Sequence, residues 1–263
     1  MQITSAQNPL VKQIRKLHQA KGRREQQLFL LEGTHLVEEA CSAGYPLVTA
    51  CCTLEWLEKH QALWQEVGQR CDRVWVVSEA VIKAIATTVT PDGVIATAPR
   101  RQPFLISELL QSPIPLILVL ETLQDPGNLG TIIRTAAASG ISGLVISTDS
   151  VDLDHPKVLR ASAGQWFRLP VIQCENLQQA LEELRACGVQ LVATTPQATL
   201  THWDLNWQQP TAILLGNEGA GLSPQLLAIA DTPVKIPLHQ GVESLNVAIA
   251  AAVILYEAQR QRR

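Results

Sequence analysis

Residues 116–134 are LILVLETLQDPGNLGTIIR, and this stretch decides the fold of the C-terminal part of the chain. Its first five residues form an apolar run that is typical of a buried strand, and the turn formers Asp-Pro-Gly-Asn follow. Asn128 is a reasonable N-cap for the helix that we expect over 129–139. Arg134 would then lie about one and a half turns into that helix. An apolar strand that leads through a polar loop into a helix indicates an α/β fold.

The same alternation continues along the chain after residue 113. Further strands are expected at 143–147, 190–193, 212–215 and 234–236, and further helices at 177–186, 224–229 and 245–259. The strands are continuous apolar runs, which favours an open parallel sheet covered on both faces. In such sheets ligands bind outside the carboxyl ends of the strands. The polar loops of this sequence fall at those ends.

Two further loops contain residues that suit ligand binding. The segment ILLGNEGAGLSP (213–224) places Glu218 among three glycines, and glycine permits positive φ and close approach of the backbone to a ligand. In GVESLNVAIA (241–250), Ser244 is the expected N-cap of the last helix and Asn246 lies in its first turn. A dinucleotide-binding fingerprint is missing, because Gly127 and Gly130 give only G-x-x-G.

The N-terminal part has its own alternation of elements. We expect residues 1–100 to form one domain, 101–112 a proline-bearing linker, and 113–263 a second domain. A helix should begin at Asn8-Pro9. Further helices are expected at 34–40, 54–67 and 78–85, and strands at 47–52, 74–77 and 93–96. This order indicates a small α/β sandwich.

Positive charge is concentrated at the start of the chain, although the net charge is −3. No acidic residue precedes Glu25. The basic residues before it are Lys12, Arg15, Lys16, Lys21, Arg23 and Arg24. Such segregation suggests a face that binds a polyanion, since phosphate contacts dominate nucleic-acid affinity. A solvated helix face remains an alternative from charge alone.

Several classes of protein are disfavoured by the bulk properties. No apolar run reaches the roughly 18 residues of a membrane span, and the N-terminus lacks the pattern of a signal peptide, so a cytoplasmic protein is expected. The six cysteines contain no C-x-x-C pair and the histidines are dispersed. A metal cofactor is therefore not expected.

Taken in order, the three loops resemble the motifs of the SpoU (TrmH-like) family of RNA 2′-O-ribose methyltransferases in the SPOUT superfamily. The stretches that carry the likeness are DPGNLGTIIRTAAASG, LLGNEGAGLSP and IPLHQGVESLNVAIAAAVILYE, within residues 115–260. The segment ITSAQNPLVKQIRKLHQAKGRREQQLFLLEG is similar to the L30e-like substrate-binding domain of relatives that modify ribosomal RNA. The resemblance implies a trefoil knot, which a general rule against knots would exclude. It also implies a homodimer formed through the knot region.

The resemblance also implies a cofactor and a set of site residues. The cofactor is S-adenosylmethionine, and the basic N-terminal stretch is expected to contact RNA, ribosomal rather than transfer RNA. The implied catalytic residues are Asn128, Arg134, Glu218, Ser244 and Asn246. The implied cofactor-binding residues are Thr194, Thr195, Leu215, Gly216, Asn217, Gly219, Ile236, Leu238, Leu245 and Asn246. Trp166 departs from the family pattern, which suggests a smaller residue there.

The implied reaction is a direct displacement at the sulfonium methyl group, which requires deprotonation and in-line positioning of the ribose 2′-hydroxyl. In the family, the arginine that matches Arg134 is assigned as the base. Because a guanidinium normally stays protonated, Arg134 is instead expected to be essential for binding the adjacent phosphate and stabilising the developing oxyanion, and the group that accepts the proton is left open. A knotted RNA-binding or ribosome-assembly factor without catalysis is the main alternative. A nucleotide-binding oxidoreductase is disfavoured by the missing phosphate fingerprint.

Overall fold

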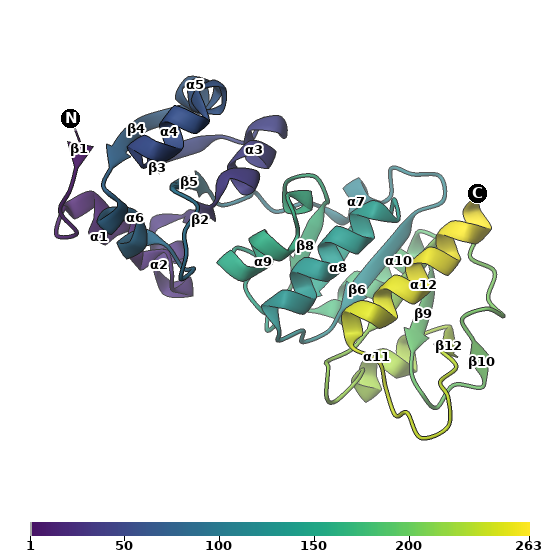
Figure 1. Cartoon of the computed structure of the whole chain (residues 1–263). Helices are drawn as coiled ribbons and strands as arrows, with labels where there is room; N and C mark the ends of the chain where they lie inside the picture. The colour runs from purple at the N-terminus through teal and green to yellow at the C-terminus, as the bar shows by residue number, and fades with distance from the viewer. Residues whose placement is uncertain (1) are drawn as a thin grey trace. The chain divides into compact units, whose positions relative to one another are not determined.

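The computed structural model describes residues 2–263 and divides the chain into two compact units (Figure 1). The first unit comprises the residues up to Arg101 together with Asp152–Phe167. The second comprises Gln102–Val151 and Arg168–Arg263. The chain therefore leaves the second unit after Val151 and returns to it at Arg168.

The first unit is built on a five-stranded mixed sheet with the order β1-β4-β3-β5-β2. Strand β5 runs antiparallel to both of its neighbours, whereas β1, β4 and β3 are parallel. The strands are β1 (Gln2–Ile3), β2 (Leu28–Glu32), β3 (Leu47–Cys52), β4 (Cys71–Val77) and β5 (Val94–Pro99). The structure confirms the three strands expected here and adds β1 and β2.

Helices of the first unit begin where the sequence provides caps. Asn8 accepts a hydrogen bond from the backbone N–H of Leu10 and so caps α1 at the expected position. The expected helix over 54–67 is instead two helices that meet at His60. The helices are α1 (Pro9–Lys16), α2 (Ala20–Gln26), α3 (Thr34–Ser42), α4 (Leu54–Lys59), α5 (Gln61–Arg70), α6 (Glu79–Ile85) and α9 (Pro156–Ala161), followed by a 3₁₀ turn at Gln165–Phe167.

The second unit contains a seven-stranded sheet in which every neighbouring pair is parallel, with the order β10-β12-β9-β11-β6-β7-β8. The expected parallel sheet is confirmed. Its strands are β6 (Leu116–Leu120), β7 (Gly143–Ser147), β8 (Val171–Cys174), β9 (Gln190–Thr194), β10 (Leu200–Thr201), β11 (Thr211–Leu215) and β12 (Thr232–Lys235). β8 and β10, which are short, were not expected from the sequence.

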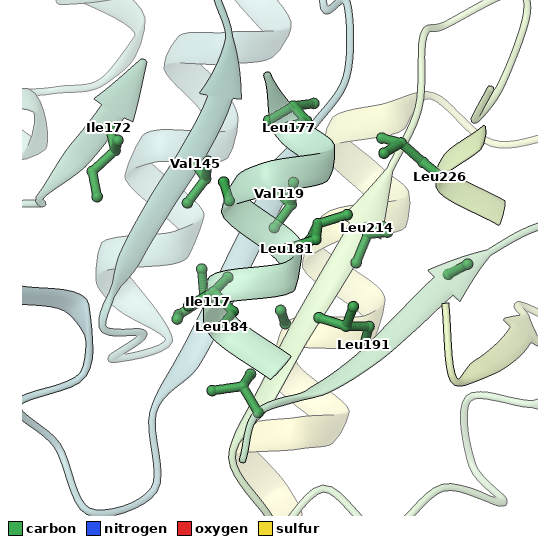
Figure 2. Packing of buried hydrophobic residues seen from close by; sticks show 14 of the residues in the cluster. Ile117, Val119, Val145, Ile172, Leu177, Leu181, Leu184, Leu191, Leu214 and Leu226 are labelled. Carbon is green, nitrogen blue, oxygen red and sulfur yellow. The ribbon is translucent and has the colours of Figure 1, made fainter. Parts of the chain in front are cut away.

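Helices cover both faces of this sheet. Figure 2 shows α10 in front of the strands and the C-terminal helix α12 behind them. Leu181 and Leu184 of α10 are fully buried against sheet residues such as Val119 and Leu214. Truncating a buried leucine of this kind to alanine costs about 2–5 kcal/mol. The helices are α7 (Ile106–Leu109), α8 (Pro126–Ala138), α10 (Leu177–Ala186), α11 (Pro224–Ile229) and α12 (Val247–Arg262).

Candidate active site

The loop between β6 and α8 is fixed by a cap that the sequence interpretation misplaced. Asp125, and not Asn128, is the N-cap of α8, because its Oδ1 accepts the backbone N–H of Asn128 at 2.9 Å. Pro126 occupies the first helical position, where its missing N–H costs no hydrogen bond. The helix therefore starts earlier than expected. Arg134 lies more than two turns into it, and the side chain of Asn128 is not needed as a cap.

The loop after β11 can close only with glycine at its first position. A Cβ on Gly216 would stand 2.0 Å from the carbonyl carbon of Gly221. Asn217 and Gly221 exchange two backbone hydrogen bonds of 3.0 Å across this loop. The side chain of Asn217 accepts from the N–H groups of Gly219 and Ala220, and donates to the carbonyl of Thr122 at 2.8 Å. The second loop is thus tied to the first.

Three predicted catalytic residues meet in one hydrogen-bond chain, which we call the three-loop clamp: Asn128, Glu218 and Asn246. Asn128 donates to Glu218 Oε1 at 3.1 Å and accepts from Asn246 Nδ2 at 2.9 Å. The Oδ1 of Asn246 accepts the N–H groups of Ala248 and Ile249, which makes Asn246 the N-cap of α12. The expectation of Ser244 as that cap was wrong. Each loop contributes one residue to the clamp.

The carboxylate of Glu218 is held ionised by this arrangement. Partial burial raises its pKa, but hydrogen bonds from Asn128 and from the backbone of Asp125 and Gln124 outweigh burial, so that the pKa lies below its usual value. The backbone donors lie 3.1 and 3.3 Å from the carboxylate oxygens. Glu218 therefore acts as an anionic acceptor that holds the first loop.

Arg134 and Ser244 differ from the clamp residues. Both side chains are exposed, and within residues 2–263 neither makes a hydrogen bond or an ion pair. The structure therefore joins three of the five predicted catalytic residues and leaves two with unoccupied polar groups. Unoccupied donors and acceptors are the ones that remain available to a substrate.

A cavity of about 140 Å³ lies where β9 and β12 end. Five residues of the predicted cofactor set line it: Thr194, Thr195, Ile236, Leu238 and Leu245. Its other lining residues are Pro196, Val234, Lys235, Glu243, Ser244 and Ala250. Leu215, Gly216, Asn217 and Gly219 belong to β11 and the loop after it, and Asn246 belongs to the three-loop clamp. None of these five residues lines the cavity. Apolar walls with threonine hydroxyls suit a flat heterocycle that carries a ribose.

Sequence reasoning missed the two charged residues of this cavity, Lys235 and Glu243. A signal for Lys235 was present, because it is the single lysine between residue 158 and the C-terminus. Glu243 immediately precedes the Ser-Leu-Asn element. Both belong to segments that the motifs had already singled out, but neither was selected.

In the first unit, basic side chains gather around a concavity of about 510 Å³ between α1 and α2. Its lining includes Lys12, Arg15, Lys16 and Lys21 of the predicted RNA-binding set. The two helices approach closely at Gly22, where a Cβ would stand 2.0 Å from the carbonyl oxygen of Lys16. Arg24 is exposed on α2.

Arg23 is a correction to that predicted set. Its side chain is 1% exposed and forms an ion pair with Asp152 at 2.7 Å. The same guanidinium donates to the carbonyl groups of Leu17 and His18, at 2.9 and 3.2 Å. Because its donors are occupied and buried, Arg23 is a structural residue of the first unit.

Two absences hold for the described residues. No helix among residues 2–263 is long and apolar enough to cross a membrane. In the same residues no group of three histidine, cysteine, aspartate or glutamate side chains could hold a metal ion.

Family models match both parts of the chain. The model of the SpoU rRNA Methylase family matches residues 115–256, and that of the MRM3-like substrate binding domain matches residues 8–96. An uncharacterised tRNA/rRNA methyltransferase of Synechocystis is 49% identical over 99% of this chain and 94% of its own length. The 23S rRNA (guanosine(2553)-2′-O)-methyltransferase RlmP of Bacillus subtilis is 36% identical over 97% of this chain and 98% of its own.

Solved structures extend the likeness to the fold. The AdoMet-bound rRNA methyltransferase of Sinorhizobium meliloti is 33% identical, with a TM-score of 0.89 over 99% of this chain and 97% of that one. The parallel sheet of the second unit matches that of these SPOUT methyltransferases. The family match spans more than half of the chain and includes all three loops. The chain therefore belongs to the SpoU rRNA methylase family and is an S-adenosylmethionine-dependent RNA 2′-O-methyltransferase.

Proposed function

We propose that this enzyme methylates a ribose 2′-hydroxyl of 23S ribosomal RNA, with the reaction taking place beside the three-loop clamp. The observation that carries the proposal is the clamp itself. Asn246 follows directly on Ser244 and Leu245, which line the cavity, and it is joined through Asn128 to Glu218. The names of the relatives support the choice of RNA, because RlmP and several RlmB enzymes are described as 23S rRNA 2′-O-methyltransferases.

In this proposal the cavity at the ends of β9 and β12 holds the cofactor, whose sulfonium supplies an electrophilic methyl group. Apolar side chains such as Ile236 and Leu245 cover the adenine, and the backbone at Gly216 contributes polar groups from the adjoining loop. The cavity is smaller than the roughly 300–1,000 Å³ of typical ligand pockets, so it receives only part of the cofactor.

Arg134 is the residue that we assign to the reacting ribose. Its guanidinium remains charged and is exposed without a partner in residues 2–263. A charged donor that is free in the resting enzyme can bind the adjacent phosphate and stabilise negative charge as it develops on the 2′-oxygen. The clamp residues position the loops, and Ser244 offers a free hydroxyl at the edge of the cavity.

The basic concavity of the first unit is assigned to RNA phosphates. Its lysines and arginine are exposed, and among residues 2–263 only Lys21 of this group forms an ion pair, at 3.8 Å from Glu25. Released counterions make such contacts strongly dependent on salt. The exposed Arg24 belongs to this proposed RNA-binding surface, whereas the buried Arg23 does not.

A homodimer through the C-terminal helix is part of the proposal, together with the trefoil knot that the family resemblance implies. Ile249 and Tyr256 are 52% and 51% exposed on α12, seven residues apart, and therefore lie on one face of that helix. Val242 and Leu245 extend the apolar surface at 50% and 36% exposure. A second copy of the chain would cover it.

Modification of ribosomal RNA would take place in the cytoplasm.

The proposal is tested by transfer of labelled methyl groups to isolated ribosomal RNA. We expect label in 23S RNA and none in 16S RNA, and the loss of one 2′-O-methyl mark from 23S RNA in a strain without this enzyme. Binding of RNA and cofactor without transfer to any RNA would favour the assembly-factor alternative.

The dimer is tested separately, by light scattering. The wild type should have twice the mass of the chain, and Tyr256→Asp should shift the protein toward the monomer, because a charge would be buried in the interface. A monomeric wild type at micromolar concentration would contradict the dimer without affecting the assignment of the substrate.

A further inference from the structure

The proposed cofactor cavity contains two opposite charges and no others. Of the described residues that line it, only Lys235 and Glu243 are charged, and the others are apolar or hydroxylic. Lys235 is also the single lysine of the second unit. Charges of both signs thus occur together at the cavity.

These two charges are not neutralised within the protein. In the part of the chain that the structure describes, neither side chain forms an ion pair or a hydrogen bond, and they do not pair with each other. Other charges of the second unit do pair, as Arg185 does with Asp231 at 2.8 Å. Lys235 and Glu243 share this lack of a partner with Arg134, and the polar groups of all three therefore remain available to a ligand.

The backbone that carries Lys235 is fixed. Lys235 is the last residue of β12, and its backbone carbonyl oxygen accepts a hydrogen bond from the N–H of His202 at 2.9 Å. Its side chain is half-buried at the cavity wall, and no acceptor in the described residues bonds to its ammonium. A ligand carboxylate would provide an acceptor for the ammonium of Lys235, and a ligand ammonium would provide a donor for the exposed carboxylate of Glu243.

S-adenosylmethionine has complementary charges at one end only. Its adenine and ribose are uncharged at neutral pH, whereas the methionine end carries an α-ammonium and an α-carboxylate beyond the sulfonium. We propose that Glu243 binds the α-ammonium and that Lys235 binds the α-carboxylate of the cofactor. This inference rests on the proposed placement of the cofactor in this cavity, and it makes the two residues determinants of specificity for the amino-acid end.

Three ligands separate this assignment from other uses of the same residues. S-adenosylhomocysteine keeps the amino-acid end but lacks the sulfonium charge, and 5′-methylthioadenosine keeps adenosine but lacks the amino-acid end. Their affinities, and that of S-adenosylmethionine, are measured by titration calorimetry on the full chain. The proteins compared are the wild type, Glu243→Gln, Lys235→Met and the control Glu182→Gln, whose carboxylate lies on α10 outside the cavity.

Loss of one partly exposed charge-assisted hydrogen bond should weaken binding about tenfold. We expect this loss for S-adenosylmethionine and S-adenosylhomocysteine alike in both cavity variants, and no change for 5′-methylthioadenosine or in the control. Unchanged thermal unfolding of the variants confirms that they are folded.

Each other result overturns the inference. Equal weakening of 5′-methylthioadenosine would show that the residues bind the ribose. Weakening of S-adenosylmethionine alone would place Glu243 at the sulfonium, and unchanged affinities would remove both residues from cofactor binding. A wild type that binds none of the three ligands would refute the placement of the cofactor itself, and is thereby distinguished from a failure of the charge assignment.

Chemical labelling gives a second readout for Lys235. Acetylation of this lysine, followed by mass spectrometry, should be suppressed by S-adenosylhomocysteine and not by 5′-methylthioadenosine. Equal protection by both ligands would contradict the contact with the α-carboxylate.

Discussion

Two arginines, one in each unit, show how the same side chain acquires different roles. Arg23 on α2 is 1% exposed, and its guanidinium is bonded to Asp152 and to two carbonyl groups. Arg134 on α8 is exposed, and its guanidinium has no partner within residues 2–263. In sequence, both were predicted to bind RNA or to act on it. Burial and partners, which the sequence does not reveal, separate them.

The difference is that Arg23 has already paired with the protein, whereas Arg134 can still pair with a substrate. Removal of Arg23 should therefore affect folding, and removal of Arg134 should affect catalysis. The clamp residues lie between these extremes, because they bond to the protein at the edge of the reaction site. Variants of these residues test whether the two roles are distinct.

The largest effect is expected for Arg134→Ala. Loss of a charged donor at a developing oxyanion should reduce kcat for methyl transfer on the order of 10³-fold, or about 4 kcal/mol. The thermal unfolding temperature should not change, since no partner in the described residues is lost. The measurement is single-turnover transfer of labelled methyl to 23S RNA. Near-normal turnover would show that this arginine does not act on the ribose.

Arg23→Met should give the opposite pattern. It would leave the carboxylate of Asp152 and two carbonyl groups without their donor, which should lower the free energy of unfolding by about 3 kcal/mol. At temperatures where the variant is folded, transfer should be close to that of the wild type. Urea denaturation measures the loss, and the exposed neighbour changed in Arg24→Met is the matched control. Equal stability of the two variants would mean that the buried ion pair contributes nothing.

The clamp should produce an intermediate effect. Glu218→Gln keeps the shape of the side chain but removes the charge that Asn128 and two backbone N–H groups bond to. Hydrogen bonds to charged groups contribute about 1.5–3 kcal/mol, so kcat should fall about 10- to 100-fold.

A positioning role for the clamp requires coupling between its members. The kcat losses of Asn128→Ala and Glu218→Ala should therefore not add in the double variant, because each breaks the same contact. Additive losses, or a variant of Glu218 that changes only KM for RNA, would argue that these residues contact the substrate separately.

The parallel sheet was the most predictable part of the structure. Leu116–Leu120 and Gly143–Ser147 have the bounds that the apolar runs indicated. Such strands are buried on both faces, so their composition alone marks them. Helix starts were less predictable, because Asp125 and Asn128 are both good caps. The proline that follows Asp125 was the signal that could have decided between them.

Contacts between distant segments could not be predicted. The ring of Trp166 packs against aromatic rings that are far away in the sequence, 4.9 Å from that of Phe29 and 5.7 Å from that of Tyr45. Residues 152–167 belong to the first unit, although the chain on both sides of them belongs to the second. Periodicity and composition are local properties of the sequence, so they do not predict contacts between distant segments. The same limit hid the ion pair of Arg23.

The smallest effect is expected for a buried carboxylate, that of Glu32, and it depends on pH. Glu32, which is 5% exposed, is buried in the first unit. It accepts hydrogen bonds from Thr87 and Thr88 and forms an ion pair with Arg160 at 3.2 Å. Burial raises its pKa, but the four hydrogen bonds from the two threonines outweigh burial, and the pKa lies below the ordinary 4.5. A carboxyl group whose pKa is lower in the folded state contributes stability above its unfolded pKa, and loses it as the pH falls through the folded pKa.

The wild type should therefore keep this contribution at neutral pH and lose it only below about pH 4.5, whereas Glu32→Gln should lack it throughout. The measurement is the unfolding temperature of both proteins between pH 7 and pH 3, with Glu58→Gln, an exposed residue of α4, as the control. The difference in unfolding temperature between the wild type and Glu32→Gln should decrease as the pH falls. The difference in unfolding temperature between the wild type and Glu58→Gln should not change with pH. A gap that stays constant with pH would mean that the lost stability comes from packing and not from the charge. In that case the burial of a charged side chain would not by itself show that its charge stabilises the first unit. The charge of Arg23 would then need a separate test that does not depend on pH.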